Sequence, residues 1–268
     1  MTAELPSFDR PPLTEVFLAA QFEPLAKLRT SHLGQFMGGL GAAWNSLPDA
    51  PALGQTHEPV GPEPEWLASA FEIELNRGTR LRSESADSSR MLQVENGWIA
   101  LNWRGGGGSP YPRFGTLQRE FEAQLARLED LLSSNNIGTI GPNLWEVGYV
   151  NVFPRGDLWA NASEIPSLIP TLLSPGPSGT GSLQTISGRW AYVISPGVGR
   201  IQIFAEHALR GLAEPTECLM LRLIARGPVA EPSMKTMMEG LSLGHETIVR
   251  TFAQLISDRA KTHLGYNP

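Results

Sequence analysis

The sequence is poor in cysteine and in long apolar runs. Cys218 is the only cysteine among 268 residues, which excludes an internal disulfide and favours a reducing, cytoplasmic location. No apolar run reaches the roughly 18 residues that a membrane-spanning helix needs. The first residues lack the basic start and the apolar segment of a secretory signal. We therefore expect a soluble, cytoplasmic protein without a membrane partner, in which Cys218 is a small core residue.

The common signatures of metal binding and of catalysis are also missing. None of the five histidines forms an H-x-H or H-x3-H pair or lies beside the cysteine, so a zinc site has little support. The glycine run at 105–108 is not followed by the Lys-Ser/Thr of a P-loop. No Gly-x-Ser-x-Gly elbow occurs. We expect no metal and no cofactor, and we rank a binding protein above an enzyme.

The net charge also argues against one class of partner. A formal charge of −6 and a pI near 5.4 do not favour nucleic acid as a partner for the whole surface. Five arginines nevertheless fall within one predicted stretch of strands: Arg77, Arg80, Arg82, Arg90 and Arg104. Because acidic residues are interleaved with them, we interpret the stretch as a mixed, solvated surface. Nucleic-acid binding through it remains an alternative.

What the chain does contain is an apparent repeat. The pattern L-x-E-V-x5-F occurs from Leu13 to Phe22 and again from Leu144 to Phe153, an offset of 131 residues. This period is too long for a solenoid unit and indicates a duplicated module. We therefore predict two similar halves, 1–136 and 137–268, that form one compact unit.

Each half shows the same predicted order of strand, helix, three or four antiparallel strands and long helix. In the first half these are a strand at 15–22, a helix at 25–40, strands at 80–86, 91–95 and 98–104, an edge strand at 71–75 and a long helix at 115–132. Asn96-Gly97 between two of the strands is typical of a two-residue hairpin turn. Apolar residues of the long helix, spaced by three and four, form one stripe.

The second half repeats this order less clearly. We predict a strand at 140–153, a short or broken helix at 163–173 because of its prolines, strands at 183–186, 189–195, 200–206 and 218–225, and a final helix at 233–263 with a break near Gly240 or Gly244. The predicted fold class is α+β, with antiparallel sheets each packed against a long helix. The two units either join edge to edge, with the long helices side by side, or pack face to face. We favour the first arrangement.

Seven residues form the best candidate surface for a partner. They are Asn102, Trp103, Arg104, Tyr111 and Arg113, with Tyr149 and Asn151 on a similar strand of the second half. Alternation places Asn102 and Arg104 on one face of their strand and Trp103 on the other. Tryptophan and arginine are enriched among interface anchors. The alternative is that Trp98 and Trp103 fill the core between sheet and helix.

Glu15 and Glu146 occupy matching positions of the repeat, inside apolar strands where an unpaired charge is costly. If their strands meet at a pseudo-twofold axis, the two carboxylates could face each other as a general acid and base. The interpretation we favour is that each glutamate lies on a solvent face or pairs with an arginine such as Arg104 or Arg113.

Several short motifs occur in a familiar order. They are PPLTEV near the start, NWR at 102–104, YPRF at 111–114, GYVN at 148–151 and a late His245-x6-Phe252 helix ending at Gly265. Together they resemble a sporadically distributed family of prokaryotic proteins with no established activity. The chain departs from that family at its end, where HLGYNP replaces a tryptophan-glycine ending. The family's patchy distribution implies mobile genetic cargo, such as an antiphage defence or toxin–antitoxin operon.

The leading hypothesis is a non-enzymatic component that binds another protein, encoded nearby, within such a defence or toxin–antitoxin system. An acidic chain favours a protein partner with a basic surface over nucleic acid. The first alternative is a sensor of a small ligand or nucleotide, with a cavity between the sheet and a long helix. The sequence leaves the oligomeric state open.

Overall fold

The computed structural model describes residues 4–56, 78–105, 109–172, 181–211 and 215–268. Within them lies a ten-stranded antiparallel sheet in the order β3-β5-β6-β7-β2-β8-β11-β10-β9, with β4 paired to β5. The central strands are β2 (Leu13–Phe22), β7 (Trp98–Arg104), β8 (Pro142–Pro154) and β11 (Thr216–Pro228). The outer strands are β3 (Trp44–Ser46), β4 (Ala50–Pro51), β5 (Thr79–Ser85), β6 (Arg90–Glu95), β9 (Ser187–Ser195) and β10 (Gly199–Arg210).

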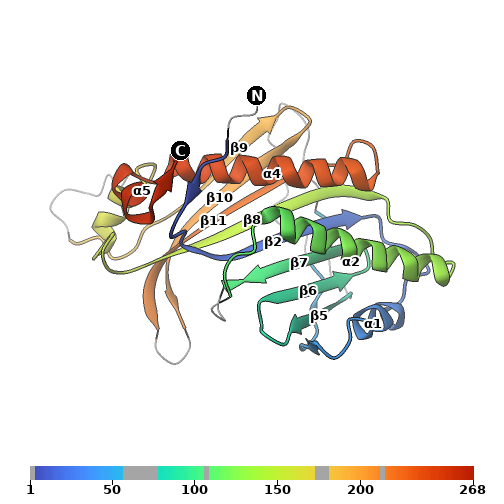
Figure 1. The fold of residues 1–268 in the computed structure, drawn as a ribbon. Helices are drawn as coiled ribbons and strands as arrows, with labels where there is room; N and C mark the ends of the chain where they lie inside the picture. Colours follow the sequence, from blue (N-terminus) through green and yellow to red (C-terminus); the bar gives the residue numbers. More distant parts are fainter. Residues whose placement is uncertain (1–3, 57–77, 106–108, 173–180, 212–214) are drawn as a thin grey trace.

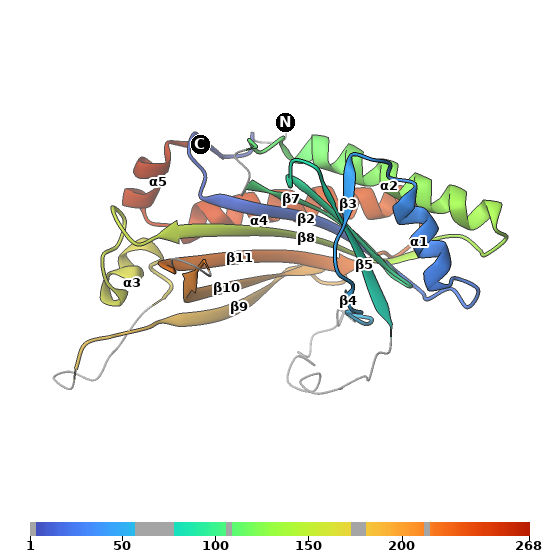
Figure 2. The ribbon, with the colours of Figure 1, turned by 90° about the horizontal axis from the view of Figure 1, so that it is seen from below.

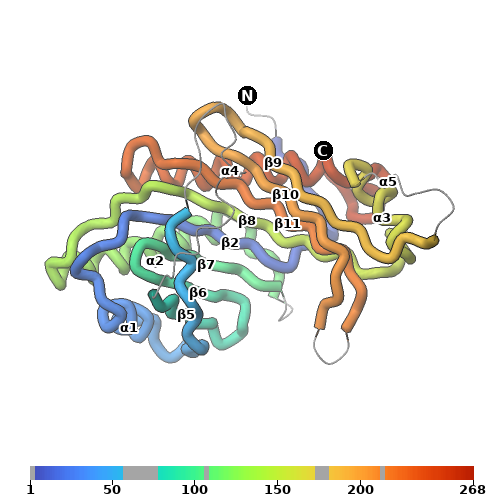
Figure 3. The backbone as a smooth tube through the Cα atoms, turned by 180° about the vertical axis from the view of Figure 1, so that it is seen from behind, coloured from blue at the N-terminus to red at the C-terminus, as the bar shows by residue number. Residues whose placement is uncertain are grey.

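The long helices lie together on one face of this sheet (Figures 1 and 2). They are α2 (Phe114–Ser134) and α4 (Met234–Leu255), with the shorter α1 (Thr30–Gly38) beside α2 and α5 (Asp258–Leu264) after α4. The view from behind shows the strands of the opposite face, which we call the open face (Figure 3). The α+β class and a single sheet that runs through both halves are therefore as predicted. No helix of the described residues is long and apolar enough to cross a bilayer.

The core fills the layer between the sheet and the helices. The predicted stripe of α2 is buried along its whole length, at Leu117, Phe121, Leu125, Leu128 and Leu132. Alternate residues of β2, among them Val16, Leu18 and Ala20, are fully buried against the helices. Cys218 is buried on β11, as expected for a core residue. The hairpin at Asn96-Gly97 is also confirmed, with Gly97 at φ 104° and Glu95 opposite Trp98.

The middle of the sheet is the antiparallel pair β2–β8. Phe17 lies opposite Gly148, and a Cβ on that glycine would come within 2.9 Å of Cδ1 of Phe17. Only glycine therefore leaves room for the phenylalanine ring across the strand pair. The register shifts once at each end of the pair, near Leu13 and near Phe22, in keeping with the long, bulged strand expected at 140–153.

The final helix breaks at a different place from the one predicted. It continues through Gly240 and Gly244 and ends at Leu255, before α5 begins at Asp258. Both glycines lie against the Trp145 ring, and a Cβ on Gly240 would lie 2.6 Å from its Cγ. Here glycine serves close packing between helix and sheet and does not interrupt the helix. The break comes instead where Ser257 caps α5 by accepting a hydrogen bond from the Ala260 amide.

Three smaller expectations also differ or fall elsewhere. The first helix begins at Thr30, five residues later than predicted, and residues 183–186 form no strand. The edge strand predicted at 71–75 lies outside the described residues. The short, broken helix of the second half is confirmed as η4 (Ala162–Glu164) followed by α3 (Ile165–Leu168).

Candidate ligand-binding cavity

A cavity of 350 Å³ lies between the sheet, α4, the start of α2 and the N-terminal segment. Its volume falls within the range of about 300–1,000 Å³ typical of small-molecule sites. Much of its wall is apolar and includes Leu5, Pro6, Phe8, Leu13, Ile248 and Phe252. Its polar lining consists of Ser7, Tyr111, Arg113, Tyr149, Asn151 and His245. A mostly apolar wall with a few convergent polar groups is the usual composition of a ligand site.

A chain of three hydrogen-bonding side chains crosses this wall. The Tyr111 and Tyr149 hydroxyls are 2.9 Å apart, and the Tyr149 hydroxyl lies 2.7 Å from Nδ1 of His245. The His245 ring stacks on Phe114 with centroids 4.2 Å apart and planes 4° apart. Tyr149 comes from β8, His245 from α4 and Phe114 from α2. The chain therefore joins the sheet to both long helices.

Burial fixes the protonation of all three groups. It lowers the pKa of His245 to about 4 and raises the pKa of Tyr111 to about 12. Burial also raises the pKa of Tyr149 well above its usual value, an effect increased by Tyr111. Removing a group from water disfavours its charged form, which is the cause in each case. At neutral pH the chain is uncharged and its members act as hydrogen-bond donors and acceptors.

Arg113 stands at the mouth of the cavity in an unusual backbone conformation. Its φ of 72° and ψ of 151° lie in a region that glycine adopts and other residues rarely do. It is the residue that precedes the first turn of α2, and it gives that helix no side-chain cap. Its positive charge acts on the Tyr111 hydroxyl, which partly offsets the rise in that group's pKa. The Arg113 side chain is exposed to solvent and close enough to Tyr111, the outer end of the hydroxyl chain, to act on it electrostatically.

The N-terminal segment is fastened over the cavity by the C-terminus. β1 (Ser7–Phe8) pairs with β12 (Tyr266–Asn267), and the amides of Asp9 and Arg10 donate to the carbonyls of Gly265 and Leu264, each at 3.0 Å. The Phe8 ring meets Phe252 of α4 edge-on, with centroids 5.2 Å apart. These contacts hold Phe8 in place as part of the cavity wall.

The seven predicted residues divide between the two faces of the sheet. Tyr111, Arg113, Tyr149 and Asn151 all line the cavity, and Trp103 packs against Tyr111 with ring centroids 5.1 Å apart. Asn102 and Arg104 belong to the open face, as the alternation predicted. Asn102, Trp103, Tyr149 and Asn151 retain only 3–6% of their exposure. These four therefore do not form the exposed surface that the sequence suggested.

Glu15 and Glu146 occupy the open face without facing each other. Glu15 lies opposite Val150, and Glu146 lies opposite Ala19, which separates the two glutamates by about four residues along the strands, roughly 13 Å. This separation excludes a general acid–base pair that shares a proton between the two carboxylates.

Each glutamate instead has its own partner. Glu146 pairs with Arg226 at 2.7 Å, which agrees with the favoured pairing with an arginine, although the partner is Arg226 and not Arg104 or Arg113. Burial raises the pKa of Glu146, and Arg226 counteracts that rise. Glu15 accepts a hydrogen bond of 2.6 Å from Asn102. Arg104, which lies beside Glu15, pairs with Glu84 at 2.8 Å.

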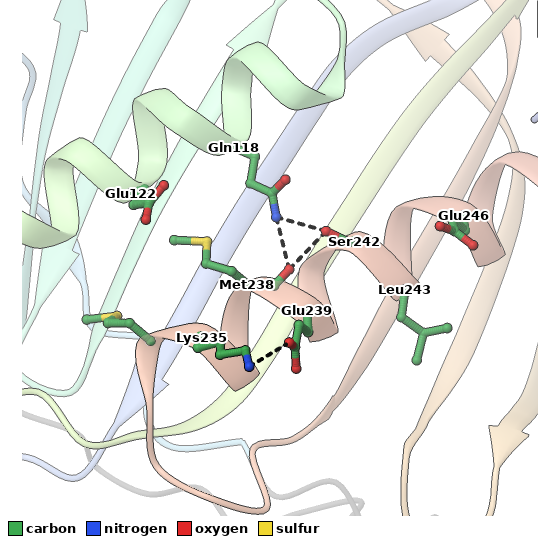
Figure 4. Close-up of a pocket in the computed structure, with 9 residues that line it drawn as sticks. Gln118, Glu122, Lys235, Met238, Glu239, Ser242, Leu243 and Glu246 are labelled. Carbon is green, nitrogen blue, oxygen red and sulfur yellow. Dashed lines mark hydrogen bonds and ion pairs between the residues drawn. The ribbon is translucent and has the colours of Figure 1, made fainter. Parts of the chain in front are cut away.

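A second hollow, the groove between α2 and α4, is a weaker candidate (Figure 4). Gln118 of α2 crosses it and donates to the Met238 carbonyl at 2.9 Å and to the Ser242 hydroxyl at 3.0 Å. Glu122, Glu239 and Glu246 line its sides. Its polar bridge is satisfied within the protein, and this contact holds the two long helices side by side.

Sequence reasoning missed His245, Phe114 and the N-terminal segment as parts of one site. His245 was weighed only as a zinc ligand, although the His245-x6-Phe252 motif places both residues on one side of a helix. Residues 5–10 gave no signal, because their role depends on pairing with the distant C-terminus. Among the described residues, no group of three His, Cys, Asp or Glu side chains is arranged to hold a metal. No protein-family model matches the chain, and no curated protein matches it.

Proposed function

We propose that this protein binds a small, largely apolar ligand in the cavity between the sheet and α4. The observation that carries this proposal is the chain Tyr111–Tyr149–His245, whose hydroxyls and ring lie in a largely apolar wall. Such a pairing of apolar wall and few oriented polar groups supports ligand recognition. It corresponds to the first alternative of the sequence analysis, a sensor of a small ligand or nucleotide, and not to its leading hypothesis of a protein-binding component.

The protonation of the chain supports binding in preference to acid–base chemistry. A general acid or base works best with a pKa near the working pH. The pKa of His245 is about 4 and that of Tyr111 is about 12, so neither group exchanges a proton readily at neutral pH. The three side chains instead provide fixed hydrogen-bonding positions.

A thermal-shift screen of small apolar molecules tests this function. A ligand that binds only the folded protein raises its melting temperature. Val249 of α4 lines the cavity, and Val249→Phe should fill part of it and abolish the shift. Val193→Phe, the same change on exposed β9, serves as the matched control and should respond like the parent. Undiminished shifts in Val249→Phe would place the ligand elsewhere, and a parent protein that no molecule stabilises would count against the function.

We also infer that the halves 1–136 and 137–268 are copies of one β-α-β(3–4)-α module. The strand orders β5-β6-β7-β2 and β9-β10-β11-β8 run outward in the same way from the central pair β2–β8. The register is symmetric as well: the 131-residue offset converts the pair Glu15–Val150 into the pair Glu146–Ala19. Glu15 lies opposite Arg104 just as Glu146 lies opposite Arg226. Superposition of 4–136 on 137–268 tests the inference, and a rotation that leaves β2 off β8 would reject it.

A protein partner is the second candidate, and β9 is the feature that favours it. β9 ends the sheet, and within the described residues its outer edge pairs with no other strand. Tyr192 and Val193 on this strand are 50% and 57% exposed. An exposed edge with apolar side chains suits the addition of a strand from another protein. Such a partner, encoded beside this chain, would fit the defence or toxin–antitoxin setting that the resemblance implies.

Nucleic-acid binding through Arg77–Arg104 is less favoured than the binding of a small ligand or of a protein partner. Arg77 lies outside the described residues. Arg90 and Arg104 form ion pairs with Glu120 and Glu84 at 2.6 and 2.8 Å, which reduces the positive charge available to phosphates. A salt-dependent shift in a binding assay would revive this alternative.

A further inference from the structure

We propose that the ligand is a monocarboxylate with an apolar body, whose carboxylate group lies between Arg113 and the Tyr111 hydroxyl at the mouth of the cavity. This inference rests on the proposed function, namely that the cavity binds a small molecule. It adds the charge, the orientation and the chemical class of that molecule.

The charges around the cavity select an anion with a single charge. Among the described residues that line the cavity, Arg113 is the one charged side chain, and none is an aspartate or a glutamate. His245 adds no charge at neutral pH because its pKa is about 4. One arginine balances one negative charge, whereas a phosphate dianion would enter an apolar cavity with half of its charge uncompensated. The charge balance of the cavity therefore favours a carboxylate over a phosphate.

The hydroxyl chain can present a donor at the same place. If Tyr111 donates to the carboxylate, its oxygen accepts from the Tyr149 hydroxyl, and the Tyr149 oxygen accepts from Nδ1–H of His245. Each of the three members then donates once, each tyrosine oxygen also accepts once, and the neutral histidine carries its proton on Nδ1. An anion beside Tyr111 selects this direction of the chain over the reverse one.

Arg113 is available for such a contact. Within the described parts of the chain, no hydrogen bond or ion pair engages its guanidinium. The exposed side chain lines the cavity mouth and acts electrostatically on Tyr111. A planar guanidinium matches a carboxylate with two parallel hydrogen bonds. Its backbone conformation suits glycine better than arginine, so a purely structural role gives no reason for a long cationic side chain here.

The remainder of the ligand would contact the apolar wall. Phe8, Phe114 and Phe252 contribute aromatic rings, and Leu13 and Ile248 contribute aliphatic side chains. Either an alkyl chain or an aromatic ring fits this surface chemically. The probes for the test therefore include one of each kind.

The test measures binding of matched probes to the full chain by isothermal titration calorimetry at pH 7.5. Decanoate is compared with decanol, and 3-phenylpropionate with 3-phenylpropanol, so that each pair differs mainly in the carboxylate. We expect at least one carboxylate to bind roughly ten-fold more tightly than its alcohol, the scale of one charge-assisted contact. Arg113→Gln and Tyr111→Phe should each remove most of this preference, measured as the ratio of the dissociation constants of the alcohol and its carboxylate.

Two further variants separate recognition from folding. Arg119→Gln removes the same charge from an exposed position in the first turns of α2, where the Arg119 guanidinium donates a hydrogen bond to the Thr116 hydroxyl, and it should bind like the parent. Arg113→Gly should raise the melting temperature, since glycine relieves the backbone strain, and still lose the preference for the carboxylate.

The possible results distinguish the two levels of the proposal. Alcohols that bind as tightly as their carboxylates would overturn the carboxylate assignment and leave the proposed function standing. If no carboxylate binds while other molecules of the thermal-shift screen do, the carboxylate assignment is likewise overturned and the proposed function stands. Unchanged carboxylate binding by Arg113→Gln would overturn the placement of the charged group.

Discussion

His245 illustrates how much of the site depends on single, buried residues. The pKa of this histidine is about 4 in the folded protein because the ring is buried, compared with about 6.5 in an unfolded chain. Between these two values the unfolded chain takes up a proton that the folded protein does not. The free energy of unfolding is therefore highest above pH 6.5, where both states are neutral. It falls as the pH drops toward 4, because protonation stabilises the unfolded chain. The whole difference corresponds to roughly 3 kcal/mol.

We predict that His245→Gln makes the fold less sensitive to acid. Between pH 7 and pH 4.5 the parent should lose about 2 kcal/mol more of its free energy of unfolding than this variant does. Urea denaturation at the two pH values measures the difference. His263→Gln replaces a histidine outside the cavity and should behave like the parent. Equal acid sensitivity of His245→Gln and the parent would show that His245 is not held neutral by the fold.

At the scale of the elements, local sequence patterns predicted the helices, strands and turns that depend only on residues close to one another in the chain. The stripe of α2, the hairpin at Asn96-Gly97 and the alternation in β7 follow from helix and strand periodicity, and all three are present. The break in the last helix does not follow from such a pattern. The helix continues through Gly240 and Gly244 because both glycines pack against the Trp145 ring of β8, about a hundred residues earlier in the chain, and it breaks only where Ser257 caps α5.

We predict that Gly240→Ala and Gly34→Ala have opposite effects. A Cβ on Gly240 would press into the buried Trp145 ring, and overpacking of this kind costs about 1–3 kcal/mol. Gly34 lies within α1, and no atom approaches the corresponding position within 4 Å. Alanine there should stabilise the fold by about 0.5–1 kcal/mol through helix propensity. Denaturant midpoints measure both effects, and a stabilised Gly240→Ala would refute the packing explanation for this glycine.

At the scale of the whole molecule, the sheet has a protected centre and an accessible end. The central pair β2–β8 is hydrogen-bonded on both sides, by β7 and by β11. β9 at the end of the sheet has Tyr192 and Val193 exposed to solvent. A partner that adds a strand would therefore meet β9 and leave the centre unchanged.

We predict that a chain encoded beside this one co-purifies with it through β9. Val193→Lys adds a charge to the edge strand, a known way to block strand addition, and should reduce the recovered partner several-fold. Leu209→Lys adds the same charge at the highly exposed far end of β10 and serves as the control. Both variants should keep the parent's melting temperature to within a few degrees. Co-purification that survives Val193→Lys, or a chain isolated without any partner, would contradict this role of β9.

By itself, the sequence determined the α+β class, most of the strands and both long helices, whereas it singled out Tyr111, Arg113, Tyr149 and Asn151 as a partner surface and not as the lining of a cavity. These features depend on periodicity, turn chemistry and the position of residues relative to their neighbours in the chain. Only the tertiary structure decided that Tyr111, Tyr149 and His245 form one chain, that Glu15 and Glu146 lie apart, and that residues 5–8 close a cavity. Each of these depends on strand register or on contacts between distant segments, because a shift of one residue in register reverses which side chains are buried.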